Sequence, residues 1–259
     1  MLNLIVMRNI NLFYGFLVGI VLCISVHDVR ANFPGQKDSL NTVKVKVFLE
    51  KGKKHLYSKN DSAMFYYEQA LPLAENLDDE NLLADCFFEI GTYHLKRKYE
   101  FQLALDLYNK SVEIYSRTKN YKQLFYNYAS LGLSYNGLNV EEKALEYYMK
   151  ALEVAESNDF EHEAGLIRLD IGNIYAIRNE FDKAEKYYLE SLEIHKQFND
   201  SSLIANCYNN LGNIYTTGTD LEKGISYYKQ ALKVHQATGN KQVISMIYGN
   251  IGETYIDMD

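Results

Sequence analysis

The chain has 259 residues, of which 47% are hydrophobic and 24% are charged, and its formal net charge is −7. This balance is that of a folded protein with a sizeable core, and it excludes a chain that is disordered throughout. A partner held through its phosphates needs clustered Lys and Arg, so the negative charge argues against nucleic-acid binding.

Residues 1–31 differ from the rest of the chain. The cation Arg8 precedes an apolar run over 12–26, and small residues follow at Val29 and Ala31. This order predicts a secretory signal peptide over 1–31, because the run is short for a membrane span of about 20 residues. An uncleaved anchor that leaves the protein facing the periplasm is the alternative. We therefore expect an exported protein, periplasmic or extracellular, with a short linker over 32–41.

The segment 42–259 repeats itself at a nearly constant interval. The anchor is a glycine that recurs in steps of 41, 40, 40 and 40 along the sequence, at Gly91, Gly132, Gly172, Gly212 and Gly252. A weaker copy surrounds Gly52. Three positions after the anchors lie His94, Tyr135, Tyr175, Tyr215 and Tyr255. At twelve and sixteen positions after three of the anchors lie the pairs Ala144 and Tyr148, Ala184 and Tyr188, and Gly224 and Tyr228.

These columns resemble the tetratricopeptide repeat, in which each repeat is a pair of helices. The usual repeat has 34 residues, and the proline that normally ends its second helix is absent here. The pattern is similar to the long-repeat members known from cell-polarity adaptors and bacterial signalling proteins. The resemblance implies an all-α fold, namely a right-handed α-solenoid of antiparallel helix pairs.

The periodicity predicts five helix pairs and a final unpaired helix. First helices are expected near 42–58, 79–97, 121–137, 160–178, 200–217 and 240–257, and second helices are expected to start near 61, 100, 140, 180 and 220. Asn139 with Glu142, and Thr219 with Glu222, have the spacing of a capping box. A helical glycine costs about 1 kcal/mol relative to alanine. We therefore expect another backbone, that of the second helix, to pass close to each anchor.

The first helices are expected to line a concave groove that binds a protein or peptide partner. Its candidate residues are the asparagines outside the core stripe: Asn173, Asn206, Asn209, Asn210, Asn213 and Asn250. An amide offers a donor and an acceptor, so a column of amides can bracket the backbone of an extended peptide. The resemblance implies the same use, since related long-repeat proteins employ groove asparagines in this way. The alternative is that these amides cap turns or face water.

The remaining polar and aromatic residues favour structural positions. Adjacent tyrosines such as Tyr147 and Tyr148 fall in one repeat column and are expected to pack rather than bind a ligand. Cys86 and Cys207 hold equivalent positions three repeats apart, about 25 Å at the usual helix spacing, so we expect buried free thiols.

The sequence lacks HExxH, GxSxG and phosphate-loop motifs, which predicts no enzyme activity, no cofactor and no metal. His195 and His235, which occupy one column of successive repeats, are the only basis for an enzymatic alternative. Their position near the ends of second helices favours a structural role.

The sixth first helix has no second helix after it, although solenoids normally cover their last apolar face. We expect a longer chain, a partner, or self-association through this helix. Two hypotheses follow. The first is an exported, non-enzymatic scaffold. The second is the N-terminal extracytoplasmic sensor segment of a longer receptor, such as a histidine kinase or transcriptional regulator, with membrane contact only through the N-terminal segment or a region beyond the chain.

Overall fold

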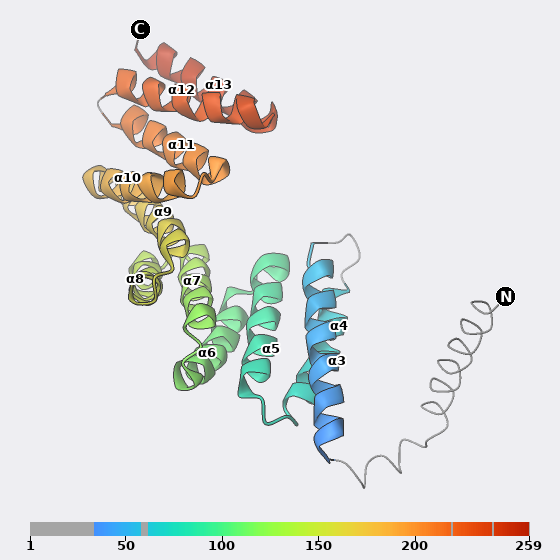
Figure 1. Ribbon diagram of the computed structural model, residues 1–259. Helices are drawn as coiled ribbons and strands as arrows, with labels where there is room; N and C mark the ends of the chain where they lie inside the picture. The colour runs from blue at the N-terminus through green and yellow to red at the C-terminus, as the bar shows by residue number, and fades with distance from the viewer. Residues whose placement is uncertain (1–33, 58–61, 219, 240, 259) are drawn as a thin grey trace, which may run out of the picture. The chain divides into compact units, whose positions relative to one another are not determined.

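The computed structural model describes residues 34–57, 62–218, 220–239 and 241–258. Within these ranges the chain forms eleven α-helices and one π-helix and no strand, which confirms the predicted all-α class (Figure 1). The signal peptide predicted over 1–31 lies outside the described residues. Each described helix is too short or too polar to span a membrane.

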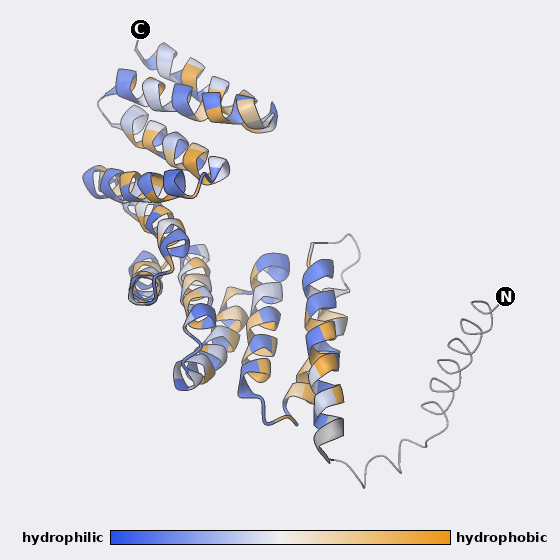
Figure 2. Cartoon of the chain, viewed as in Figure 1, coloured by the Kyte–Doolittle hydropathy of each residue, from blue (hydrophilic) through white to orange (hydrophobic). Residues whose placement is uncertain are grey.

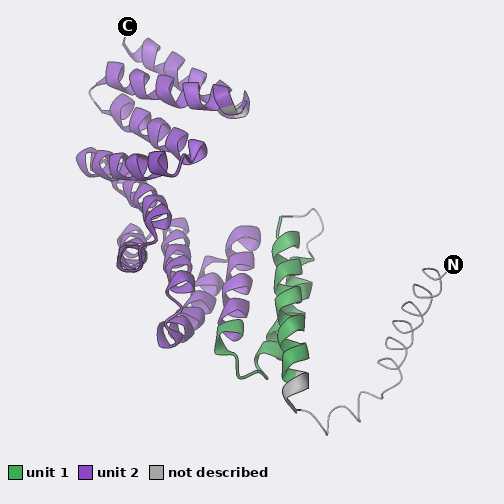
Figure 3. Cartoon of the chain, viewed as in Figure 1, with its two compact units in different colours: residues 1–82 green, residues 83–259 purple. Residues whose placement is uncertain are grey.

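The chain divides into two compact units, residues 1–82 and 83–259 (Figure 3). In the first, α3 (Pro34–His55) packs against α4 (Ala63–Ala74). The expected linker over 32–41 is wrong for residues 34–41, which belong to α3. Proline is well tolerated at the start of a helix, because the N–H that it lacks would have no helical partner there. Pro72 lies in the last turn of α4.

The second unit contains the more regular repeats. Its helices are α5 (Glu80–Tyr93), the π-helix η1 (His94–Lys98), α6 (Phe101–Thr118), α7 (Tyr121–Gly137), α8 (Glu141–Ser157), α9 (Glu161–Ile177), α10 (Phe181–Gln197), α11 (Ser201–Thr217), α12 (Leu221–Thr238) and α13 (Lys241–Asp257). From α7 onward the observed bounds lie within one residue of the predicted ones. The first helix expected over 79–97 is instead split into α5 and η1.

Left-handed residues end the helices at a regular spacing of half a repeat. They are Tyr99, Lys119, Asn139, Asp159, Asn179 and Asn199, with φ between 54° and 58°. Asn139 is therefore not the capping-box residue that we expected: it follows α7 in a left-handed turn, and Val140 precedes α8. Asparagine fits both positions, because its short amide tolerates the left-handed region. Thr219 lies outside the described residues, and Asp220 caps α12 by accepting from the Lys223 amide at 3.0 Å.

Each anchor glycine between α7 and α12 packs against a tyrosine ring. A Cβ added at Gly132, Gly172 or Gly212 would lie 2.5 Å from the ring of a tyrosine on the following helix. The prediction that a backbone passes close to each anchor glycine is thus wrong, since the neighbour is a side chain of the second helix. A Cβ added at Gly252 would meet no described atom within 4 Å. In these three helix pairs the glycine is therefore a socket for a large ring.

The other tyrosines of each repeat stack on one another. Ring centroids lie 5.4 Å apart for Tyr135 and Tyr147, and 5.6 Å apart for Tyr175 and Tyr187. These contacts confirm the predicted packing role. Cys86 and Cys207 are buried and form no disulfide, also as predicted. Figure 2 shows hydrophobic and hydrophilic residues on every described helix, as expected of amphipathic layers that share a core with their neighbours.

Candidate binding face

Asn173 joins three consecutive helices of the second unit. Its Oδ1 accepts a hydrogen bond of 2.9 Å from the Tyr188 hydroxyl on α10. The same oxygen accepts a second bond of 2.9 Å from Nδ2 of Asn210 on α11. Because α9 and α11 also contact each other directly, this amide lies where the first helices of successive repeats meet.

The arrangement continues one repeat later. Oδ1 of Asn213 accepts a bond of 2.8 Å from the Tyr228 hydroxyl on α12. The same hydroxyl lies 3.2 Å from the Thr216 hydroxyl and is hydrogen-bonded by the Asn250 side chain. We refer to the set Asn173, Asn210, Asn213, Asn250, Tyr188 and Tyr228 as the amide–tyrosine ladder.

The ladder fixes which end of each amide faces outward. A tyrosine hydroxyl donates to Oδ1 of Asn173 and of Asn213, so each Nδ2 group points away from that bond. Nδ2 of neither residue bonds to any part of the chain that the structure describes. Asn173 is half-buried and Asn213 is exposed. The face therefore presents oriented donors suited to carbonyl oxygens.

A polar pocket of about 270 Å³ lies at the C-terminal end of the ladder. Helices α11, α12 and α13 line it with Asn213, Thr216, Thr217, Tyr228, Asn250, Glu253, Thr254 and Asp257. Two of the six predicted asparagines meet here. The hydroxyls and amides give it hydrogen-bonding capacity, and its two carboxylates make it acidic.

The structure brings four of the predicted asparagines into the ladder and leaves two outside it. Asn206 is exposed and no hydrogen bond of its side chain occurs among the described residues. Asn209 is half-buried, and its enclosed Oδ1 has no partner among them. In α5, Thr92 takes the place of Asn173 and accepts from the Tyr108 hydroxyl at 3.2 Å. The hydrogen bond from the second-helix tyrosine thus also occurs in a repeat that has no asparagine in this column.

Asp170 was not among the predicted site residues, although it occupies the same repeat column as Asn210 and Asn250. Its carboxylate has no hydrogen bond or ion pair within the described part of the chain. Burial raises its pKa to about 6. The signal in the sequence is an acidic residue in a column that holds amides in the next two repeats.

The two histidines behind the enzymatic alternative, His195 and His235, are enclosed in the fold. His195 is fully buried, and its ring lies 5.3 Å from that of His162, which is 3.3 Å from Asp200. Burial and then the neighbouring His162 lower the pKa of His195. His235 is also buried, and burial lowers its pKa. Enclosed rings fit the structural role that their position near the helix ends predicts. No cluster of three metal-ligating side chains occurs among the residues described.

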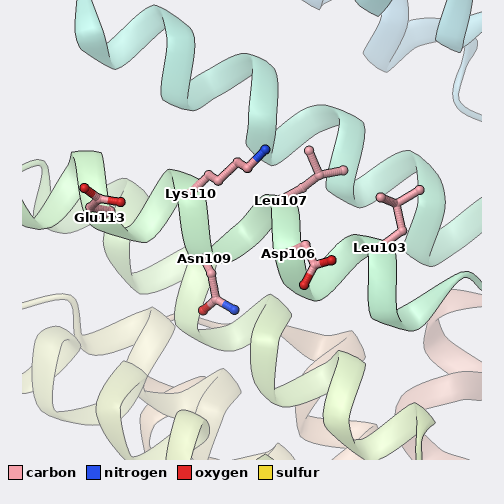
Figure 4. Close-up of a pocket in the computed structure, with 6 residues that line it drawn as sticks. All are labelled: Leu103, Asp106, Leu107, Asn109, Lys110 and Glu113. Atoms are coloured by element: carbon pink, nitrogen blue, oxygen red, sulfur yellow. The ribbon is translucent and has the colours of Figure 1, made fainter.

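A second hollow, of about 490 Å³, runs along α6 (Figure 4). Its lining residues are Leu103, Asp106, Leu107, Asn109, Lys110 and Glu113. All belong to one helix, and they mix apolar groups with both signs of charge. Because no second described element supplies converging polar groups, this hollow serves better as a control surface than as a candidate site.

Models of the tetratricopeptide repeat family match residues 126–158 and 163–237. These segments contain the repeats that carry most of the ladder. These two segments are therefore tetratricopeptide repeats, as their glycine and tyrosine columns predicted. No curated protein matches the sequence.

Solved structures share this fold. The apo form of RapI is 19% identical, with 78% of this chain and 74% of that chain covered and a TM-score of 0.72. A Rap protein complexed with competence and sporulation factor is 16% identical, with 82% and 62% covered and a TM-score of 0.67. A signal transduction ATPase with a tetratricopeptide repeat sensor, from Pyrococcus horikoshii, is 19% identical, with 90% and 36% covered and a TM-score of 0.72. At these identities the likeness establishes the fold.

Proposed function

We propose that the protein is a non-enzymatic scaffold that binds an extended protein segment on the face of the amide–tyrosine ladder. The observation that carries the proposal is the orientation of the ladder amides by tyrosine hydroxyls. Amides held in one orientation lose little freedom on binding, so their hydrogen bonds contribute more to affinity than those of mobile side chains.

The extended segment crosses α9 and α11, where Nδ2 groups of Asn173 and Asn213 donate to its backbone carbonyls. The polar pocket between α11 and α13 receives the next part of the segment. Recognition of this kind reads backbone rather than sequence, and side-chain contacts add specificity. The Rap protein with competence and sporulation factor bound supports the use of this fold to hold a ligand.

We also propose that the protein is exported, on the strength of the charged start and apolar run in residues 8–26. A second candidate function is the sensor segment of a longer receptor. It is supported by the ATPase with a tetratricopeptide repeat sensor, of which this chain spans 36%. Reading the gene beyond codon 259 separates the two. A downstream apolar span of about 20 residues favours the receptor.

The binding proposal is tested by selecting peptides from a random phage-displayed library on the wild-type protein. The selected peptides are then measured on an Asn213→Ala/Asn250→Ala variant. We expect at least a tenfold loss of affinity, since both amides line the polar pocket. Circular dichroism and urea unfolding establish that the variant is folded.

The matched control is Asn109→Ala, which removes an exposed amide from α6. Peptides that bind this variant as well as wild type, but bind the double variant poorly, support the ladder as the site. Peptides that bind the double variant undiminished and lose affinity on Asn109→Ala would refute the assignment and place the site beside α6.

A further inference from the structure

Asp170 lacks the hydrogen-bond partner that Asn210, its equivalent in the next repeat, has. Asn210, in the same column, donates to Asn173 of the preceding repeat. The residue that holds the place of Asn173 one repeat earlier is Leu133, on α7, and its apolar side chain is 44% exposed. A leucine offers no hydrogen bond, so the junction between α7 and α9 cannot close around Asp170 as the next one closes around Asn210.

Neighbouring tyrosines do not replace the missing partner. Tyr148 and Tyr188 lie near Asp170, and no hydrogen bond joins either hydroxyl to its carboxylate within the described chain. Burial, with a smaller effect of the Asp170 charge, raises the pKa of Tyr148. A phenol is never cationic, so neither tyrosine can neutralise the carboxylate. A partly buried carboxylate left in this state carries an uncompensated desolvation cost.

The cations of the neighbouring first helices are already paired elsewhere. Arg168 on α9 bonds to Glu156 and to Glu190, with Nε 3.1 Å from the Glu190 carboxylate. Lys122 on α7 pairs with Glu163. Helix α11 contains no charged residue at all. The face around Asp170 consequently offers amides, hydroxyls and carboxylates, and within the described chain it lacks a cation of its own to neutralise the buried charge.

We propose that Asp170 binds a cationic side chain, arginine or lysine, of the extended segment held by the ladder. This inference depends on the proposed function, since the ladder positions the segment. Asp170 and Asn173 are three residues apart on α9, so they share one face of the helix. A segment whose carbonyl accepts from Asn173 places a neighbouring side chain at Asp170. A guanidinium suits a carboxylate best, because its planar fork donates two parallel hydrogen bonds.

The test compares peptide selections on wild type, on Asp170→Asn and on Asp182→Asn. Asp182 is an exposed carboxylate on α10 of the same repeat, so its variant controls for the loss of one negative charge. We expect wild type and Asp182→Asn to enrich peptides with arginine or lysine at one fixed position. The Asp170→Asn selection is expected to lose that preference while still yielding peptides that depend on Asn213 and Asn250.

A binding measurement then isolates the contact. The tightest wild-type peptide is compared with a version in which citrulline replaces the arginine, or norleucine the lysine. We expect this change to weaken binding to wild type at least tenfold and to leave binding to Asp170→Asn unchanged.

The outcomes separate this inference from the proposed function. Ladder-dependent peptides without a basic position, or a citrulline penalty of equal size on Asp170→Asn, would overturn the role of Asp170 and leave the scaffold proposal standing. A selection that yields no ladder-dependent peptide would overturn both.

Discussion

Two successive junctions between first helices differ in their polar contacts. At the junction of α9 with α11, Asn173 accepts from Tyr188 and from Asn210, both at 2.9 Å. At the junction of α7 with α9, the corresponding positions are Leu133, Tyr148 and Asp170, and no hydrogen bond connects them in the described chain. We call the first the closed junction and the second the open junction.

The apolar framework is the same at both. The ring of Tyr148 lies against Gly132, and the ring of Tyr188 lies against Gly172, each 2.5 Å from an added Cβ. Packing therefore does not need the polar column, which is free to differ from one repeat to the next. Glycine and tyrosine thus maintain the packing of each helix pair, while the residues of the amide column differ between repeats and can distinguish one ligand from another.

The largest expected effect comes from filling the glycine sockets. Gly132→Ala and Gly172→Ala should each lower the free energy of unfolding by about 1–3 kcal/mol, because the methyl group forces the tyrosine ring out of place. Equal costs are expected, since both sockets have the same geometry. Urea unfolding followed by circular dichroism measures them.

The control is Gly252→Ala, where the added methyl meets no described atom within 4 Å. This change should be neutral or raise stability by up to about 1 kcal/mol, the helix propensity of alanine over glycine. A cost at the open junction much smaller than at the closed one would show that the two frameworks differ after all.

The next effect concerns the charge at the open junction. Asp170→Asn should raise the free energy of unfolding by about 1–2 kcal/mol at pH 7.5, because it removes an unpaired, partly buried carboxylate. The folded-state pKa of about 6 lies above the ordinary value of 3.8. The folded state then holds the proton more tightly, so stability falls as pH rises from about 4 to 6. The stability gained through Asp170→Asn should be full above about pH 6 and absent below about pH 4. Stability loss on this substitution at pH 7.5 would mean that Asp170 has a stabilising partner.

Removing tyrosine hydroxyls should distinguish the junctions more finely. Tyr188→Phe takes one of two donors from Asn173 and is expected to cost about 1 kcal/mol. Tyr148→Phe removes a hydroxyl with no hydrogen-bond partner among the described residues and should stay within about 0.5 kcal/mol of wild type. Comparable losses in the two variants would contradict the assignment of one junction as open.

The smallest expected effect concerns the left-handed turn that precedes each first helix of the two junctions. Lys119 has φ of 57° just before α7. Lys119→Gly should raise the free energy of unfolding by about 0.5–1 kcal/mol, because glycine adopts the left-handed region without a Cβ clash. Lys119→Ala is the control and should bring no gain. Thermal unfolding of the two variants gives the comparison.

Much of the fold could be predicted from the sequence. Glycine spacing placed helices from α7 onward within one residue of their observed bounds. Predictions of helix ends from short sequence patterns were wrong where one residue type suits two structural positions. Asn139 has the spacing of an N-cap, yet it ends the preceding helix in a left-handed turn. Socket glycines indicate a close neighbour without saying whether it is a backbone or the Tyr188 ring.

The candidate site was less accessible from the sequence. The asparagine column led to Asn173, Asn210, Asn213 and Asn250, but it also included Asn206, which joins no contact of the ladder. Which amides bond to tyrosines depends on helix packing, and a list of polar residues does not contain that information. Asp170 becomes notable only when Asn210 is seen to have a partner that Leu133 cannot provide.

The most direct test of the open junction is an NMR titration of the Asp170 side-chain carboxyl carbon, assigned with Asp170→Asn. In the free protein we expect a pKa of about 6, caused by burial without a partner. With a saturating arginine-containing peptide from the wild-type selection, the pKa should fall below the ordinary aspartate value, because a guanidinium stabilises the charged form. A carboxyl that titrates near 4 in the free protein, or that the peptide does not shift, would contradict both the unpaired state of Asp170 and its role in binding.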